Sequence, residues 1–282
     1  MNIEGKGIYE CKAKGVFRNK NVKPIVGDNV EIDVLSGQEL IGNITQVLER
    51  SNQLVRPEVA NIDQALIVFA LQSPKPNLNL LDRFLVMMER QELPCVICLN
   101  KTDLEEEQKI REIKEMYESA GYLVLCTSVL QDEGTKELWE CLQGRTTALA
   151  GPSGVGKSSM LNALLGTGQA QTGCVSERIG RGKHTTRHTE IFQLGKNTYL
   201  MDTPGFSSLY TDMEKEELKE YFPEFREYEG MCRFLGCVHM EEPDCMVKEK
   251  VEEGNISKSR YENYRWMFQD MKNRKKTERK FK

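Results

Sequence analysis

The sequence has no apolar run that approaches the ~20 residues needed to cross a bilayer. Its first ten residues, MNIEGKGIYE, contain no apolar stretch, so we expect no signal peptide and no membrane partner. It also has no excess of positive charge, because the formal net charge is −4. Contacts with nucleic acid must therefore come from local basic patches.

A disulfide framework is also lacking. The nine cysteines are odd in number and mostly scattered in apolar, strand-like runs, which fits a reducing cytoplasm. Cys95 and Cys98 lie in such a run, and we interpret them as core residues rather than as a redox or ligand pair. A chain of 282 residues with 39 % hydrophobic and 29 % charged residues can form two or three domains with buried cores.

Residues 1–60 predict a small β-domain. VGDNVEIDV (26–34) and LIGNITQVL (40–48) alternate apolar and polar residues around glycine-containing turns. Several short strands of this kind favour an OB-like β-barrel, although a β-meander fits the same pattern. The basic residues that would suit an RNA-binding face are Lys6, Lys12, Lys14, Arg18, Lys20 and Lys23.

Residues 61–211 alternate between strand and helix patterns, which predicts a parallel α/β sheet. The expected strands are 65–71, 95–100, 122–126 and 146–150, the expected helices are 79–93, 105–121, 134–144 and 157–165, and a hairpin is expected from 190–194 and 198–202.

A P-loop motif follows the strand at 146–150 and precedes a helix. Gly151, Gly156, Lys157 and Ser158 fit the pattern G-x-x-x-x-G-K-[ST]. In such a loop the backbone N–H groups surround the phosphates, the lysine reaches the β and γ phosphates, and the serine hydroxyl holds Mg²⁺. The expected nucleotide-binding residues here are Gly151, Pro152, Ser153, Gly154, Val155, Gly156, Lys157, Ser158 and Ser159.

The sequence DTPG (202–205) stands after the next strand and fits the D-x-x-G motif. We expect Asp202 to bind Mg²⁺ through water and the Gly205 amide to sense the γ-phosphate. The polar, basic segment 177–190 between the two motifs is a candidate switch loop. Either Thr185 or Thr186 supplies a hydroxyl to Mg²⁺, and we favour Thr186. A basic loop without a ligand role fits the same segment.

A base-reading motif, Asn100-Lys101-Thr102-Asp103, follows the strand at 95–100. The Asp103 carboxylate can accept hydrogen bonds from N1–H and the 2-amino group of guanine, which adenine does not offer. Lys101 can lie along the base, and Asn100 can tie this loop to the P-loop. Thr127 and Ser128, after the following strand, are placed to support the base carbonyl through backbone N–H groups.

The base-reading half of the domain thus precedes the phosphate half, which is the reverse of the usual order. A circular permutation preserves such a site because the ligand contacts only the assembled strand ends. The chain is cut after DTPG, so the γ-phosphate sensor runs directly into the C-terminal region. We hypothesise that the nucleotide state is passed mechanically to that region.

Residues 212–282 predict a helical zinc-binding domain. Cys232, Cys237, His239 and Cys245 form C-x4-C-x-H-x5-C, a complete tetrahedral set for one structural Zn²⁺. Unrelated buried cysteines are the alternative. The tail 272–282 carries seven Lys or Arg and one Glu, which would suit RNA phosphates or simply a solvated helix end.

This combination of motifs resembles the ribosome small-subunit-dependent GTPase A family over essentially the whole chain. The resemblance implies a circularly permuted P-loop GTPase domain, flanked by an N-terminal OB-fold and a C-terminal zinc domain. It implies GTP hydrolysis stimulated by the small ribosomal subunit and a late role in maturation of that subunit. GTP, GDP, the subunit and its rRNA would be the partners of a cytoplasmic monomer.

No glutamine follows D-x-x-G, because Phe206 occupies that position and cannot orient water. We therefore expect slow intrinsic hydrolysis. His184 is the candidate catalytic residue, and the resemblance supports a histidine there, although a solvated loop histidine is the alternative. His188 is a weaker candidate for positioning the attacking water. Arg181 or Arg187 could supply positive charge to the reaction or simply bind RNA. A second interpretation is an RNA-binding module for which GTP is only a conformational ligand. A third is an ATPase, but Asp103 in the N-K-x-D motif argues against it.

Overall fold

The computed structural model describes residues 1–3, 6–13, 17, 22–55, 57–166, 189–203 and 213–280, with side chains as far as residue 273 in the last helix. The chain divides into two compact units. The first unit comprises Met1–Gln64, Trp139–Ala150 and Ser158–Phe206, and the second comprises Ala65–Leu138, Gly151–Lys157 and Ser207–Lys282. The division into domains at 1–60, 61–211 and 212–282 stays a prediction.

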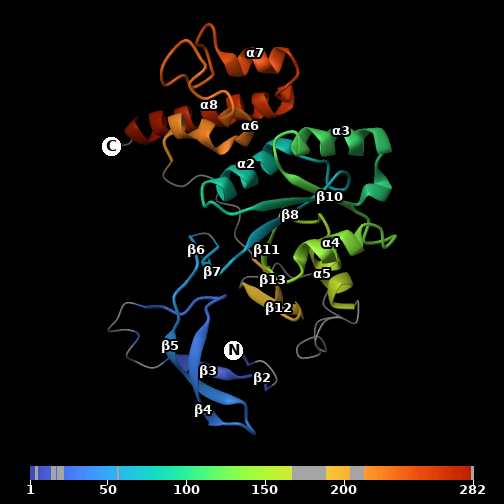
Figure 1. Cartoon of the computed structure of the whole chain (residues 1–282), viewed down its shortest axis with the longest axis vertical. Coiled ribbons are helices and arrows are strands. Elements are labelled where there is room, and N and C mark those ends of the chain that lie inside the picture. Colours follow the sequence, from blue (N-terminus) through green and yellow to red (C-terminus); the bar gives the residue numbers. More distant parts are fainter. Residues whose placement is uncertain are drawn as a thin grey trace. The chain divides into compact units, whose positions relative to one another are not determined.

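The N-terminal β-domain, coloured blue in Figure 1, belongs to the first unit. Its central sheet has the order β3-β5-β4, formed by β3 (Glu10–Ala13), β5 (Ile41–Val47) and β4 (Val30–Ser36). The shorter strands pair antiparallel, β1 (Asn2–Ile3) with β2 (Gly7–Ile8) and β6 (Gln53–Leu54) with β7 (Val59–Ala60).

The strand predicted at 26–34 begins later, at Val30. Gly27 takes a φ of +95°, and the Asp28 carboxylate accepts a hydrogen bond from the Ile25 N–H at 2.8 Å. The same carboxylate, fully buried, pairs with Arg50 at 2.6 Å. Residues 25–28 are therefore held in a turn, as the turn signal Gly27-Asp28 in the sequence indicates, and the strand starts only after it.

Three parallel strands of the α/β region lie together in the order β10-β9-β8. They are β8 (Gln64–Ala70), β9 (Cys95–Asn100) and β10 (Leu123–Thr127), with helices α2 (Leu78–Glu89), α3 (Glu107–Glu118) and α4 (Thr135–Leu142) following in turn. Every residue of β8 is buried, as its apolar run predicts. Helix α2 ends four residues earlier than predicted, since Glu92 adopts a left-handed φ of 53° and Pro94 follows.

The phosphate half contributes three strands of the first unit in the order β11-β13-β12. Strand β11 (Thr146–Ala150) is parallel to β13 (Thr198–Asp202), and β12 (Glu190–Gly195) is antiparallel to β13. The predicted hairpin around residues 195–197 is thus confirmed. Helix α5 (Lys157–Gly166) begins directly after the P-loop.

The C-terminal region is helical, with η2 (Lys215–Tyr221), α6 (Pro223–Arg226), α7 (Met246–Glu252) and the long helix α8 (Lys258–Lys280). Helix α8 packs on η2, α7 and α2 (Figure 1). The core of this region is rich in aromatic rings, among them Phe222, Phe225 and Tyr264. None of the helices in the described part of the chain is long and apolar enough to cross a membrane.

Candidate functional site

The P-loop, Gly151–Lys157, has two glycines that no other residue can replace without a shift. Gly151 has a φ of +137°, and a Cβ there would lie 2.2 Å from the carbonyl oxygen of Val68. Gly156 has a φ of +100°, and a Cβ there would lie 2.4 Å from Nδ2 of Asn100. The motif glycines are therefore required both by backbone conformation and by the close approach of two neighbouring strand ends.

The Lys157 ammonium folds back over the start of the P-loop. Its Nζ donates to the carbonyl oxygens of Gly151 at 2.9 Å and Pro152 at 2.7 Å. Ser158 and Ser159, in the first turn of α5, are exposed. The lysine and the helix N-terminus thus present positive charge on the same short segment, which is chemistry that suits phosphate.

The base-reading motif contacts the P-loop inside the second unit. Asn100 is buried, and its Nδ2 donates to the Val155 carbonyl at 2.8 Å, so the predicted tie between the two loops is present. Lys101 adopts a left-handed φ of 62°, and its Nζ donates to the carbonyls of Gly154, at 2.8 Å, and Ser73. The contact with Ser73 has no signal in the sequence, because it depends on the path of the loop before α2.

Asp103, in the short helix η1 (Thr102–Leu104), is held by Ser128. The Ser128 hydroxyl donates to Oδ1 of Asp103 at 2.6 Å, while the Thr127 hydroxyl donates to Oδ1 of Asn100 at 3.1 Å. The Ser128 N–H, expected to support a base carbonyl, donates to the carbonyl of Glu133 at 3.0 Å. A base carbonyl would have to share or replace that bond.

Asp202 ends β13 in the first unit, where it is in register with Leu149 of β11. The next residue, Thr203, donates its hydroxyl to the Leu149 carbonyl at 3.0 Å. Asp202 therefore stands at the carboxyl end of the strand beside the one that leads into the P-loop. The remaining predicted residues, His184, Thr185, Thr186, His188, Arg181, Arg187, Gly205 and Phe206, lie outside the described residues.

Comparison with known proteins places the chain in a family. A family model described as RsgA GTPase matches residues 47–212, and one described as RsgA N-terminal domain matches residues 3–41. The chain belongs to the RsgA GTPase family. It is 55 % identical over 273 residues to the small ribosomal subunit biogenesis GTPase RsgA of Agathobacter rectalis, covering 96 % of this chain and 90 % of the relative. The RsgA of Clostridium perfringens is 48 % identical over 271 residues, with 96 % and 93 % covered.

Solved structures agree with the RsgA assignment. YjeQ from Thermotoga maritima is 41 % identical, with a TM-score of 0.75, covering 93 % of this chain and 89 % of the other. YloQ, titled a circularly permuted GTPase, is 36 % identical, with a TM-score of 0.75 and coverage of 94 % and 87 %. The family resemblance and the permuted fold are thereby confirmed, and this RsgA-family chain is a GTPase.

The predicted metal ligands come together in the loop between α6 and α7. One ligand atom from each of Cys232, Cys237, His239 and Cys245 lies within 4.8 Å of every other. The Cys232 and Cys245 sulfurs are 3.8 Å apart, and Nδ1 of His239 is 3.6 and 3.3 Å from them. A tetrahedral Zn²⁺ requires sulfurs ~3.8 Å apart and nitrogen ~3.6 Å from sulfur, so the group fits such an ion.

Burial raises the pKa of the Cys237 thiol to about 12, and it also raises the pKa of Cys245 and lowers that of His239. The imidazole is therefore in the neutral form that binds a metal. The thiols would lose protons when a cation binds, since a thiolate is the ligand.

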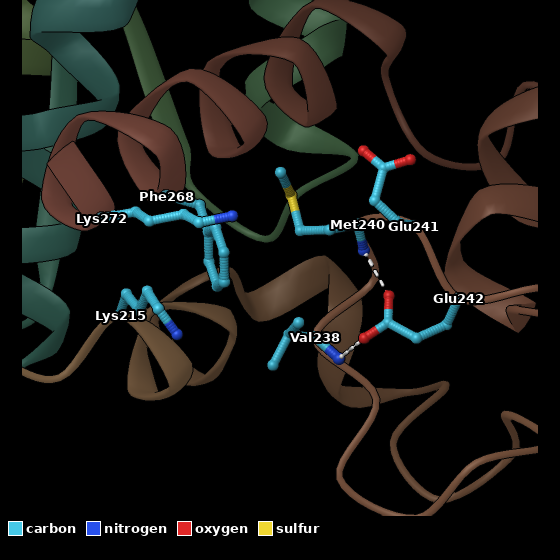
Figure 2. Close-up of a pocket in the computed structure, with 7 residues that line it drawn as sticks. All are labelled: Lys215, Val238, Met240, Glu241, Glu242, Phe268 and Lys272. Carbon is cyan, nitrogen blue, oxygen red and sulfur yellow. Dashed lines mark hydrogen bonds between the residues drawn. The ribbon is translucent and has the colours of Figure 1, made fainter.

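Glu242 holds the backbone around the histidine in place, a role that no pattern in the sequence indicates. Its carboxylate accepts hydrogen bonds from the N–H groups of Val238, at 2.9 Å, and Met240, at 2.8 Å, on either side of His239 (Figure 2). The Tyr261 hydroxyl donates to the His239 carbonyl at 2.7 Å. These bonds fix the left-handed φ of 55° at His239, which turns the imidazole toward the sulfurs.

Proposed function

We propose that this GTPase acts late in the maturation of the small ribosomal subunit and hydrolyses GTP while bound to that subunit. The relatives at 55 % and 48 % identity bear the name small ribosomal subunit biogenesis GTPase, which supports this function. GTP, GDP, the subunit and its rRNA are the partners in this proposal. The protein works as a monomer in the cytoplasm.

The nucleotide binds across the two hydrogen-bonded loops. Gly151 to Ser159 hold the phosphates, while Asn100 to Asp103, with Thr127 and Ser128, hold guanine. The observation that carries this assignment is that Asn100 and Lys101 donate to P-loop carbonyls, because base and phosphate sites must be linked rigidly to read one ligand. Ser158, Asp202 and Thr186 hold the Mg²⁺ that neutralises charge on the β and γ phosphates.

The guanine assignment is tested by replacing Asp103 with Asn. An amide cannot accept both hydrogen bonds from guanine, so we expect GTP affinity to fall ~10- to 100-fold. Xanthosine triphosphate, which carries a carbonyl in place of the 2-amino group, should gain affinity, and ATP should remain excluded. Ser128→Ala removes only the hydrogen bond of 2.6 Å from the Ser128 hydroxyl to Asp103, so it should cause a smaller loss of GTP affinity. Unchanged GTP binding in Asp103→Asn would refute the base site.

Hydrolysis without the ribosomal subunit is slow in this proposal, because Phe206 replaces the water-orienting glutamine. His184 positions the attacking water when the subunit is bound. We expect His184→Ala to bind GTP normally and to lose most of the stimulated turnover. A variant that kept full stimulated turnover would remove this assignment.

One structural Zn²⁺ binds at Cys232, Cys237, His239 and Cys245. Four protein ligands fill a tetrahedral shell and leave no open position for substrate, so the ion stabilises the fold and takes no part in hydrolysis.

The decisive experiment is steady-state GTP hydrolysis with and without isolated small ribosomal subunits, with large subunits as the control. We expect strong stimulation by the small subunit alone. A second candidate, an RNA-binding module that uses GTP as a conformational ligand, is favoured by Phe206. Tight GTP binding with no stimulation would support that candidate and contradict the ribosome-gated enzyme.

A further inference from the structure

Trp266 is a large aromatic residue on the surface of α8 that leaves 51 % of its area exposed. The chain has only two tryptophans. Leaving the large apolar surface of one of them in water is unfavourable, so its exposure suggests a role at the surface. Tryptophan at a surface is characteristic of binding sites, because its flat ring gives a large contact area with few rotatable bonds.

Arg83 of α2 lies over the Trp266 ring, with its guanidinium carbon 4.3 Å from the ring centroid. Two neighbours hold that guanidinium. Its Nε donates to Oδ1 of Asn79 at 2.9 Å, and one terminal nitrogen is 3.8 Å from the Asp270 carboxylate. The stack is therefore fixed between two helices before any ligand arrives, which lowers the entropy cost of binding.

Hydrogen-bonding amides lie beside the stack. Nδ2 of Asn79 is 3.4 Å from Oδ1 of Asn263, and Nδ2 of Asn263 donates to Oδ2 of Asp82 at 2.6 Å. Asn79 and Asn263 are both partly exposed. Asn79 thus joins the Arg83 guanidinium to a second amide, and amides of this kind can recognise the polar edge of a base.

Positive charge continues along the same helix. Helix α8 extends to Lys280, and residues 272–280 contain six Lys or Arg and one Glu. At 1.5 Å per residue, Lys272 lies about 9 Å and Lys280 about 21 Å along the axis from Trp266. A single-stranded nucleic acid that places one base on the ring can therefore run its phosphates along a basic helix.

We propose that Trp266 and Arg83 form a stacking platform for an unpaired RNA base, and that the basic end of α8 binds the adjoining phosphates. The proposal rests on the proposed function in that it takes RNA to be a partner. It adds the site and the form of RNA, which is single-stranded, because bases inside a duplex are covered on both faces by their neighbours, whereas unpaired bases can turn a face to the ring.

The test uses the protein's own fluorescence. In the full-length chain, Trp139→Phe leaves Trp266 as the only tryptophan. We expect a short single-stranded RNA to quench this signal strongly and the same sequence in a duplex to quench it much less, because only the terminal base pairs of a duplex have a free face. Equal quenching by both forms would indicate charge attraction alone and would overturn the proposal.

Variants at position 266 separate stacking from apolar contact. Trp266→Leu should weaken single-stranded RNA binding ~5- to 100-fold, the range measured for loss of one base–aromatic stack. Trp266→Phe keeps a ring and should retain most of the affinity, which also covers the case that the leucine variant folds poorly. The matched control is Phe234→Ala, which removes another exposed aromatic ring, with the Arg233 guanidinium carbon 5.6 Å from its centroid. It should bind RNA as the parent does.

Two measurements keep this proposal distinct from the proposed function. If small subunits stimulate the wild type but Trp266→Leu binds single-stranded RNA normally, the platform is wrong and the ribosomal function stands. If RNA quenches Trp266 and Trp266→Leu loses affinity while subunits stimulate nothing, the platform stands and the ribosomal function fails. Normal RNA binding by Trp266→Leu together with weaker subunit binding would assign the ring to a protein and overturn the proposal.

Discussion

Gly156 and Asn100 approach each other so closely that each determines what the other can be. The space between the Gly156 backbone and Nδ2 of Asn100 does not admit a methyl group, because a Cβ would lie 2.4 Å away. Asn100 in turn uses that amide to hold the Val155 carbonyl. Glycine at this position therefore serves the contact between the loops as well as the turn.

Gly156→Ala should weaken GTP binding at least tenfold, because the methyl group must displace Asn100 or move the P-loop, and the positive φ adds ~1–2 kcal/mol of strain. Binding of a fluorescent GDP analogue measures the effect. The control is Gly166→Ala at the end of α5, where a Cβ would meet no atom within 4 Å, and this variant should bind nucleotide normally. Normal binding by Gly156→Ala would contradict the role given to this contact.

At the scale of elements, a buried arginine joins three helices. Arg260 of α8 donates to Asp82 of α2 at 2.5 Å and to both oxygens of Glu224 of α6 at 2.6 and 2.9 Å. All three charged groups are almost fully buried, and desolvation raises the pKa of Asp82 although the charge of Arg260 opposes this. The group fixes which helices meet, since misplacing one of them leaves an unpaired buried charge.

Arg260→Met should lower the free energy of unfolding by ~3–5 kcal/mol, because it leaves two carboxylates buried without a cation. A carboxyl with a raised pKa in the folded state favours folding when protonated, so the deficit should shrink as the pH falls. Urea unfolding at several pH values measures both effects. Arg265→Met, whose exposed ion pair with Glu241 spans 3.9 Å, should change stability by less than ~1 kcal/mol. Equal changes in the free energy of unfolding in the two variants would show that the buried ion pairs of Arg260 stabilise the fold no more than an exposed pair does.

The Cys/His loop is the second element whose order depends on long-range contacts. Removing the metal with a strong chelator should loosen residues 232–245 and lower the melting temperature, while the aromatic core around Phe222, Phe225 and Tyr264 keeps α8 helical. Metal analysis should find one zinc per chain, and none in Cys245→Ser. Cys11→Ser, which changes a cysteine far from the loop in sequence, should keep its zinc. A full zinc content in Cys245→Ser would contradict the ligand set.

At the scale of the whole molecule, the permutation determines which segment follows DTPG, the motif that we propose to sense the nucleotide state. The motif DTPG ends the GTPase half, and the chain continues from it into η2 and the C-terminal helices. In the unpermuted order this segment would lead into the base-reading half instead. In this hypothesis, a change at the γ-phosphate is passed along the chain to the region that carries Cys232–Cys245 and helix α8.

Hydrogen exchange tests this route. Backbone amides of residues 213–280 should be protected differently with a GTP analogue and with GDP, because ordering of the preceding segment restrains η2. Helix α3, on the base-reading side, should show the same protection with both nucleotides and serves as the internal control. The same protection of residues 213–280 in both states would rule out mechanical coupling.

The sequence by itself determined the alternation of strands and helices in the α/β region, the nucleotide motifs and the four cysteine and histidine residues that the structure brings together. These features are local: an apolar run fixes β8, glycines mark the P-loop, and four ligands fall within fourteen residues, Cys232 to Cys245. The turn at Gly27-Asp28 before β4 is local too, but the ion pair of Asp28 with Arg50, which buries this carboxylate, joins residues 22 positions apart and has no signal in the sequence.

Only the tertiary structure decided the contacts that join distant segments. Arg260 meets Asp82 across 178 positions, and Arg83 meets Trp266 from the same pair of helices. In the sequence, Glu242 does not differ from the many other acidic residues. The path of the loop places its carboxylate at the N–H groups on either side of His239. The sequence around a charged or aromatic residue contains no periodic pattern that identifies its partner. Only the packing of the folded chain therefore shows whether the side chain is buried, paired or available for binding.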